Sequence, residues 1–247
     1  QNLIPRPKYV AMGTGRIARI HVAKAEGFHS AVFPSFSRST GPGVPIRLRR
    51  WDQLSKTDRA KLPPEAKKLS TDPEAYAIQL RKKDGWMVGG GEHGLQHALA
   101  TLRQMVQFAE DRGEALPEMT LVDWPDTAIR GAHVCYHAVR EWMPYSAPSF
   151  DELIRALERF AQCKFNTVLL ELEAMFPFQR HPEIPVACAF TPEQIAQIAA
   201  TCQALRLDLI PLVQCLGHQY YALYHERHAD LRETPDTIRQ LCPSNPK

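Results

Sequence analysis

The sequence predicts an α/β protein in two parts. Residues 1–122 form a small α+β domain, and residues 123–247 form the first three β/α units of a TIM (β/α)8 barrel. Three observations support this prediction. In the first part a period-two segment with a turn signal indicates a hairpin, and a 3.6-residue apolar period indicates one long helix. In the second part short apolar strands alternate with two capped helices, the order typical of a parallel sheet.

The first quarter of the chain is irregular, with short strands expected at 31–33 and 44–46. The pattern becomes clear at residues 76–80, which alternate with period two, and at 86–88 after the turn residues 83–85 (Lys-Asp-Gly). We expect a hairpin here, because Asp-Gly supplies the positive-φ turn that joins two antiparallel strands.

A helix is predicted from about His93 to Asp111, ended by Gly113. Its apolar side chains recur at the period of one helix face. They are Leu95, Ala98, Leu99, Leu102, Met105 and Val106.

Three further strands are predicted at residues 132–136, 167–172 and 207–213. Ser149 with Glu152 predicts a capping box that starts the helix after the first of them, and Thr191-Pro192 starts the next helix. Asp151-Glu152 is therefore interpreted as a helix start and not as a catalytic pair, because acidic groups favour a helix N-terminus. Parallel neighbours need such crossover helices, and strands buried on both faces are almost continuously apolar.

A complete (β/α)8 barrel needs about 250 residues, and only three strands fit into the second part. We expect a chain truncated after the third strand, or one completed by the C-terminal half of the same barrel. Without that half, the third strand would be left with an open edge.

The composition excludes several classes of protein. The net charge is +3, and the basic run 46–50 is interpreted as a solvated strand or loop, so no nucleic-acid partner is expected. No stretch reaches the roughly 20 apolar residues of a membrane span. Six cysteines form no C-x-x-C pair, which favours buried free thiols and a reducing, cytoplasmic compartment. Because the sequence begins at Gln1, localisation stays unassigned. No cofactor and no metal are expected.

Candidate site residues gather where the predicted strands end. Glu171 and Glu173 end the second strand, and His218 follows the third, just before Tyr220 and Tyr221. In parallel α/β folds the carboxyl ends of the strands share one edge, where binding sites lie. Carboxylates bind sugar hydroxyls and aromatic faces pack on sugar C–H surfaces, so this rim suits a carbohydrate.

Several motifs make the sequence similar to family 20 glycoside hydrolases, the β-N-acetylhexosaminidases. The leading matches are the segment before the first strand, a K-x-N signature before the second, and a Gly-His loop with Leu where the family has Pro. Segments after the second strand and on the third are closest to the hexosaminidase D-like branch, and weaker matches lie upstream. The segment before the first strand is 122–125 with 129–131, the K-x-N signature lies in 164–169, and the Gly-His loop is 216–218. The hexosaminidase D-like segments are 171–178 with 181–184 and 210–214, and the upstream matches are 3–7 and 94–102.

The resemblance implies removal of terminal β-linked N-acetylhexosamine from a glycan or glycoside by a substrate-assisted, retaining mechanism. The substrate's acetamido oxygen attacks the anomeric carbon, an Asp orients the acetamido group, and an adjacent Glu is the general acid. In the family that Asp-Glu pair ends strand four, beyond Lys247. We therefore expect the 247-residue chain alone to be inactive. Two alternatives remain open: a non-catalytic carbohydrate-binding relative, and a chain that only associates with its missing half.

The resemblance also assigns roles to individual residues. Arg130 matches an Arg that holds sugar hydroxyls, and His218 matches a His that supports the general acid. Glu171 and Glu173 occupy polar, substrate-binding positions of the second strand, while Ala174 replaces an expected Asp. Each residue has a structural alternative: an ion pair of Arg130 with Asp123 or Asp126, an ordinary loop position for His218, and pairing of the two glutamates with arginines.

His93 and His97 have the i, i+4 spacing of a zinc-binding helix. Gly94 occupies the position where a metalloprotease helix carries its catalytic Glu. A metalloprotease is therefore the minor interpretation of this segment.

Overall fold

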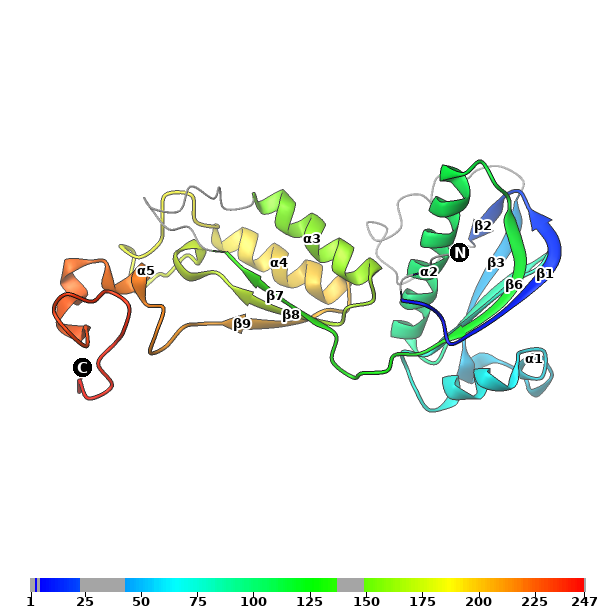
Figure 1. Cartoon of the computed structure of the whole chain (residues 1–247), viewed down its shortest axis with the longest axis horizontal. Helices are drawn as coiled ribbons and strands as arrows, with labels where there is room; N and C mark the ends of the chain where they lie inside the picture. The colour runs from blue at the N-terminus through cyan, green and yellow to red at the C-terminus, as the bar shows by residue number, and fades with distance from the viewer. Residues whose placement is uncertain (1–2, 4, 23–42, 137–148, 247) are drawn as a thin grey trace. The chain divides into compact units, whose positions relative to one another are not determined.

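The computed structural model describes residues 3, 5–22, 43–136 and 149–246, so the strand expected at 31–33 lies outside the described residues. The chain forms two compact units, one of residues 1–130 with 158–165 and one of residues 131–157 with 166–247 (Figure 1). The units divide after Arg130, whereas the start predicted for the second part, Asp123, is the last residue of a strand in unit 1.

Unit 1 contains a six-stranded mixed sheet with the strand order β1-β6-β4-β5-β3-β2. The β2–β3 and β3–β5 pairs are parallel and the other pairs antiparallel. The strands are β1 (Tyr9–Ile17), β2 (Ile20–Val22), β3 (Val44–Arg50), β4 (Tyr76–Leu80), β5 (Gly85–Gly89) and β6 (Leu116–Asp123).

Strand β1 corrects the prediction that the first quarter of the chain is irregular. Most of its side chains are exposed, so it carries no alternating apolar pattern. Its place is secured by the backbone ladder to β6, in which Tyr9 lies opposite Val122 and Ile17 opposite Leu116. A Cβ at Gly13 would lie 2.8 Å from the Cβ of Glu118, so glycine permits this close pairing.

The predicted hairpin is confirmed, because β4 and β5 pair antiparallel with Leu80 opposite Gly85. The expectation that Gly85 supplies a positive-φ turn residue is wrong. Gly113, at the end of α2, is the positive-φ glycine of the described residues, and Gly85 is the first residue of β5. A Cβ at Gly85 would lie 2.3 Å from Cδ1 of Ile46 on the neighbouring strand and 3.2 Å from the Gln79 carbonyl oxygen. Glycine at this position therefore leaves room for the Ile46 side chain.

Both faces of this sheet are covered. Helix α2 (Glu92–Asp111) packs on one face, where its predicted apolar stripe is buried apart from the partly exposed Val106. The opposite face carries a second apolar cluster that includes Leu54, Leu69 and Val88. The segment that covers it is built from the short helices η2 (Trp51–Gln53), α1 (Lys56–Arg59) and η3 (Pro64–Ser70).

Burial on α2 explains the state of His97. Its side chain is 5% exposed, its Nδ1 lies 3.3 Å from the carbonyl oxygen of Glu74, and its ring contacts Tyr76. Burial, followed by the positive charge of Arg130, lowers the pKa of His97 to about 3. The imidazole is therefore neutral and part of the core.

This pKa predicts a pH-dependent stability. Unfolded His97 binds a proton below its ordinary pKa of 6.5, and the folded form does not until about pH 3, so stability is lost as the pH falls through that window. Between pH 7 and pH 5 the loss should be about 2 kcal/mol, from about 1.4 kcal/mol per unit. Urea unfolding of wild type and His97→Gln at both pH values measures it. Equal losses in the two proteins would contradict the assignment.

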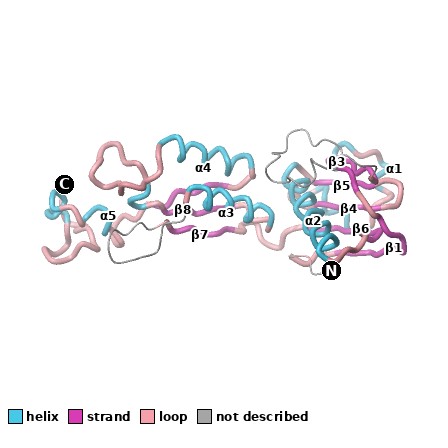
Figure 2. The backbone as a smooth tube through the Cα atoms, turned by 90° about the horizontal axis from the view of Figure 1, so that it is seen from above, coloured by secondary structure: helices cyan, strands magenta, loops and turns pink. Residues whose placement is uncertain are grey.

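Unit 2 contains a three-stranded parallel sheet in the order β7-β8-β9, as the β-α-β-α-β pattern predicts. Its strands are β7 (Gly131–Cys135), β8 (Thr167–Glu171) and β9 (Asp208–Leu212). Helices α3 (Phe150–Gln162) and α4 (Pro192–Ala204) lie on one face of the sheet (Figures 1 and 2). Val168 and Leu170 are buried, whereas His133 and Ile210 of the opposite face are exposed. The parallel sheet and its two helices match the start of a (β/α)8 barrel.

The predicted helix starts are confirmed. Glu152 Oε2 accepts a hydrogen bond from the Ser149 backbone N–H at 2.6 Å, while the Glu152 N–H donates to Ser149 Oγ at 3.3 Å. Thr191 and Gln194 form the same reciprocal arrangement at the start of α4. These contacts confirm the capping role of Glu152, and Asp151 lies in the same first turn of α3.

The cysteines correct another expectation. All six are free, but Cys202 is the buried one and Cys135, Cys163, Cys188 and Cys215 are exposed. Apolar neighbours in the sequence suggested burial, yet Cys215 follows the outer strand β9, and its neighbours Val213 and Leu216 are each 62% exposed. Within the described residues, no helix has the length and hydrophobicity needed to span a membrane.

Candidate functional site

Glu171 lies at the centre of the polar groups that end the parallel sheet. It is the last residue of β8, and only 2% of it is exposed. Oε1 accepts a hydrogen bond from Gln214 Nε2 at 2.5 Å, and Oε2 accepts one from Cys135 Sγ at 2.8 Å. His133 Nε2 lies 2.9 Å from Oε2. The carboxylate is therefore held in one orientation by groups from all three strands or their ends.

His133 and Cys135 belong to this site and were not predicted. They are alternate residues of β7, so they share the sheet face that carries Glu171, which pairs with Cys135 across β7 and β8. Burial, followed by the nearby Glu171 carboxylate, raises the pKa of Cys135 to about 12. The thiol therefore serves as a hydrogen-bond donor at neutral pH. Two polar residues alternating within an otherwise apolar strand were the signal that could have revealed them.

An aromatic surface adjoins the carboxylate. The rings of Phe178 and Tyr221 stack with centroids 6.3 Å apart and an interplanar angle of 11°, and Phe176 contacts Phe178 edge-on at 5.0 Å. The Tyr221 hydroxyl donates to the Gln214 carbonyl at 3.4 Å, and burial raises the pKa of Tyr221. The rim thus places a buried, hydrogen-bonded carboxylate near aromatic rings, two kinds of group that also occur in sugar sites.

Glu173 and His218 occupy unusual backbone conformations. Both have positive φ, 43° for Glu173 at the start of η4 (Glu173–Met175) and 57° for His218. His218 is exposed and forms no hydrogen bond or ion pair with the residues that the structure describes. Left-handed conformations in non-glycine residues cost free energy and concentrate at binding sites. Lys164 and Arg206 also have positive φ and lie outside this rim, so the backbone conformation alone assigns no role to Glu173 or His218.

Arg130 lies elsewhere. It immediately precedes β7, at the amino end of the strand whose other end faces Glu171. Its guanidinium binds both carboxylate oxygens of Glu74, at 2.5 and 3.2 Å, and donates to the carbonyl oxygens of Lys164 at 2.8 Å and Thr127 at 2.8 Å. These contacts favour an ion-pair role, although with Glu74 in place of the expected Asp123 or Asp126.

The K-x-N segment also has a structural arrangement. Lys164 Nζ donates to the Tyr76 hydroxyl at 2.7 Å and to Asp123 Oδ2 at 3.3 Å, with both charged side chains no more than 7% exposed. Burial lowers the pKa of Lys164, and Asp123 opposes that shift. Lys164 and Asp123 therefore form a buried ion pair inside unit 1.

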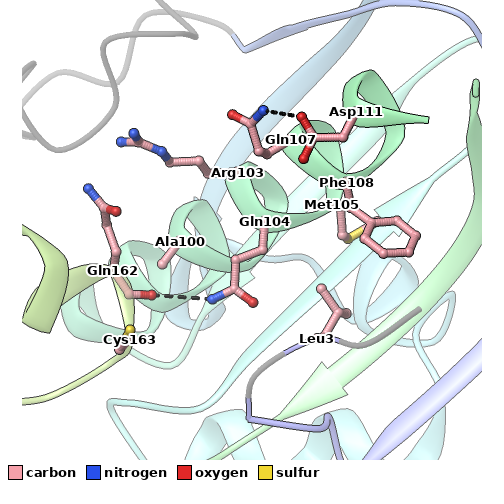
Figure 3. A pocket seen from close by; sticks show the side chains of 10 residues that line it. All are labelled: Leu3, Ala100, Arg103, Gln104, Met105, Gln107, Phe108, Asp111, Gln162 and Cys163. Atoms are coloured by element: carbon pink, nitrogen blue, oxygen red, sulfur yellow. Dashed lines mark hydrogen bonds between the residues drawn. The ribbon is translucent and has the colours of Figure 1, made fainter. Parts of the chain in front are cut away.

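Two cavities accompany these features. One of about 290 Å³ in unit 2 is lined by aliphatic residues of β8, α4 and β9 and by the rings of Phe176, Phe178 and Tyr221, with Glu173 and Gln214 as its polar residues. The other, of about 500 Å³, lies in unit 1 beside α2 (Figure 3). In the second cavity the amides of Gln104 and Gln107 are bound by the Gln162 carbonyl and by Asp111. Neither cavity has the oriented carboxylate of the rim.

Two groups of side chains in the described part of the chain could hold a metal ion. One is His133, Cys135 and Glu171 at the rim, and the other is His181, Glu183 and His228 in the segments beyond it. His93 and His97 belong to neither group.

Comparisons with known proteins agree with this architecture. Residues 1–124 match the family model described as glycosyl hydrolase family 20, domain 2. A β-hexosaminidase of Akkermansia muciniphila is 25% identical over 231 residues, which cover 82% of this chain and 45% of that protein. Hexosaminidase D of Bos taurus is 39% identical over 77 residues, which cover 30% of this chain and 22% of that protein.

The same relationship holds for the fold. The family 20 β-N-acetylhexosaminidase of Streptomyces coelicolor A3(2) superimposes with a TM-score of 0.70 at 21% identity, covering 99% of this chain and 54% of that one. The chain thus spans about half the length of the relatives that it matches over most of its own sequence. On the family model, which matches half of the chain, this protein belongs to glycoside hydrolase family 20.

Proposed function

We propose that the chain supplies the first part of the sugar-binding rim of a β-N-acetylhexosaminidase that removes terminal β-linked N-acetylhexosamine. The observation that carries this proposal is Glu171, a carboxylate 2% exposed and oriented by Gln214 beside the stacked Phe178 and Tyr221. An oriented carboxylate can accept hydrogen bonds from sugar hydroxyls, and stacked rings can pack on the C–H face of the sugar.

The mechanism proposed is the substrate-assisted one. The acetamido oxygen of the substrate bonds to the anomeric carbon as the bond to the leaving oxygen breaks, and the general acid protonates that oxygen. Water then attacks the anomeric carbon, the bond to the acetamido oxygen breaks, and the deprotonated general acid takes a proton from the water, so the sugar is released with retention. In this scheme Glu171 and Glu173 bind hydroxyls, and His218 positions the general acid.

The test uses the full-length protein that contains this sequence and a chromogenic β-N-acetylglucosaminide. Glu171→Gln should lower kcat/KM by about ten- to a hundred-fold, because a charge-assisted hydrogen bond contributes roughly 1.5–3 kcal/mol. Glu193→Gln, at an exposed position in the first turn of α4, is the matched control and should leave kcat/KM unchanged. His218→Ala should lower kcat more than it raises KM and change the pH profile.

A normal kcat/KM for Glu171→Gln would contradict the proposal. Binding of the sugar without turnover by the wild-type protein would instead support a non-catalytic carbohydrate-binding relative.

A further inference from the structure

Two histidines and a glutamate converge in unit 2 beyond the rim. Glu183 Oε1 lies 2.8 Å from His228 Nε2 and 3.5 Å from His181 Nδ1, and the three ligand atoms all lie within 4.8 Å of one another. His181 and Glu183 belong to the segment between η4 and α4, and His228 belongs to η5 (Glu226–Leu231). The cluster therefore joins the segment after β8 to the segment after β9.

The spacing suits a zinc ion. Zinc binds histidine nitrogen and carboxylate oxygen at about 2.0–2.2 Å, so two ligand atoms on a tetrahedral ion lie about 3.3 Å apart. The observed 2.8 and 3.5 Å to Glu183 Oε1 bracket that value. Two imidazoles favour zinc and similar transition metals, whereas calcium and magnesium take oxygen ligands.

Glu183 has an unused acceptor. Its Oε2 is buried and accepts no hydrogen bond from the described residues, although Arg227 Nη1 lies 3.2 Å away as an ion-pair partner. The Arg227 side chain is 63% exposed and can turn into solvent when a cation binds. Zinc would replace Arg227 as the cation that neutralises this oxygen, and a carboxylate oxygen is an established zinc ligand.

The backbone around the cluster is held in place. The Ile184 N–H donates to the His181 carbonyl at 3.1 Å and closes a turn, and Ile184 itself is buried. The next residues are tied to η4, since the Val186 N–H donates to the Ala174 carbonyl at 3.0 Å. On the other segment the His228 N–H donates to the His225 carbonyl at 2.9 Å. The backbone that carries the three ligands is thus fixed by hydrogen bonds, while the half-exposed His181 side chain can adjust to an ion.

We propose that His181 Nδ1, Glu183 and His228 Nε2 form a zinc-binding site that fastens the segment after β8 to the segment after β9. Three protein ligands leave the fourth position to water. The histidines bind as neutral imidazoles, so zinc affinity falls as the pH decreases. This site was not expected from the sequence, because its ligands lie 45 residues apart in the chain (Glu183 to His228).

The experiment is isothermal titration of ZnCl₂ into the full-length protein that contains this sequence, after removal of metals with EDTA. Wild type should bind zinc at the site, and Glu183→Gln, His228→Ala and His181→Ala should each bind it at least tenfold more weakly. His181 is 50% exposed, so its replacement should preserve the fold even where His228→Ala does not, and melting temperatures without zinc check this.

Three control variants distinguish zinc binding at this site from zinc binding elsewhere on the chain. His225→Ala removes a neighbouring ring that contacts His228, and Cys135→Ser removes the thiol of the other cluster, so both should retain zinc binding at this site. Arg227→Ala should bind zinc at least as tightly as wild type, because a competing cation is removed. The proposal is overturned if wild type binds no zinc, if the three ligand variants bind it as wild type does, or if only Cys135→Ser abolishes binding.

Discussion

Replacing Asp123 by alanine should lower the free energy of unfolding by about 3–5 kcal/mol, the cost typical of removing one partner of a buried ion pair. The Lys164 ammonium would keep its buried position, 7% exposed, without its carboxylate. The Tyr76 hydroxyl, 2.9 Å from Asp123 Oδ2, would lose an acceptor at the same time. Urea denaturation followed by circular dichroism measures the change.

The matched control for this substitution is Asp126→Ala. Asp126 is also paired with a lysine, Lys8, but its side chain is 76% exposed, so its removal should cost less than about 1 kcal/mol. A double variant, Asp123→Leu with Lys164→Met, should recover much of the stability, because apolar pairs can replace buried ion pairs. Equal costs for Asp123→Ala and Asp126→Ala would show that burial of the first pair is not important for stability.

Elements with a strong local pattern could be predicted from the sequence. Helix α2 and strands β4, β8 and β9 were found within one or two residues, because apolar periodicity directly reflects which face is buried. Strand β1 was missed, since most of its residues are exposed and pairing with β6 holds it in place. Such long-range backbone pairing has no signature within the strand itself.

The site was predictable only in part. The carboxyl ends of parallel strands meet at one edge whatever their side chains, so Glu171 and Tyr221 could be expected on one rim. The contacts of Glu171 with Cys135 and His133 depend on the register of β7 and β8, which the sequence does not specify. The same holds for Arg130, whose partner Glu74 lies 56 residues earlier in the chain.

Arg130→Ala tests whether the Arg130–Glu74 ion pair stabilises the protein. Loss of the guanidinium should lower the free energy of unfolding by about 2–3 kcal/mol. This is somewhat less than for a fully buried pair, because both side chains retain some exposure (18% for Arg130 and 17% for Glu74). Arg130→Lys should recover little, since an ammonium cannot bind two carboxylate oxygens and two carbonyls as the guanidinium does. Sugar affinity of the full-length protein should be unchanged in both variants.

Glu74→Gln separates the two roles of Arg130. If Arg130 serves as an ion-pair partner, Glu74→Gln should destabilise the protein about as much as Arg130→Ala. In Arg130→Ala the loss of the guanidinium charge should also raise the pKa of His97 from about 3, and NMR titration of the ring can follow this change. A sugar-binding Arg130 predicts the opposite pattern, with a ten- to hundred-fold loss of sugar affinity at nearly unchanged stability. Because stability, the His97 pKa and sugar affinity are measured on the same variants, a single set of proteins decides whether Arg130 binds sugar or serves as the ion-pair partner of Glu74.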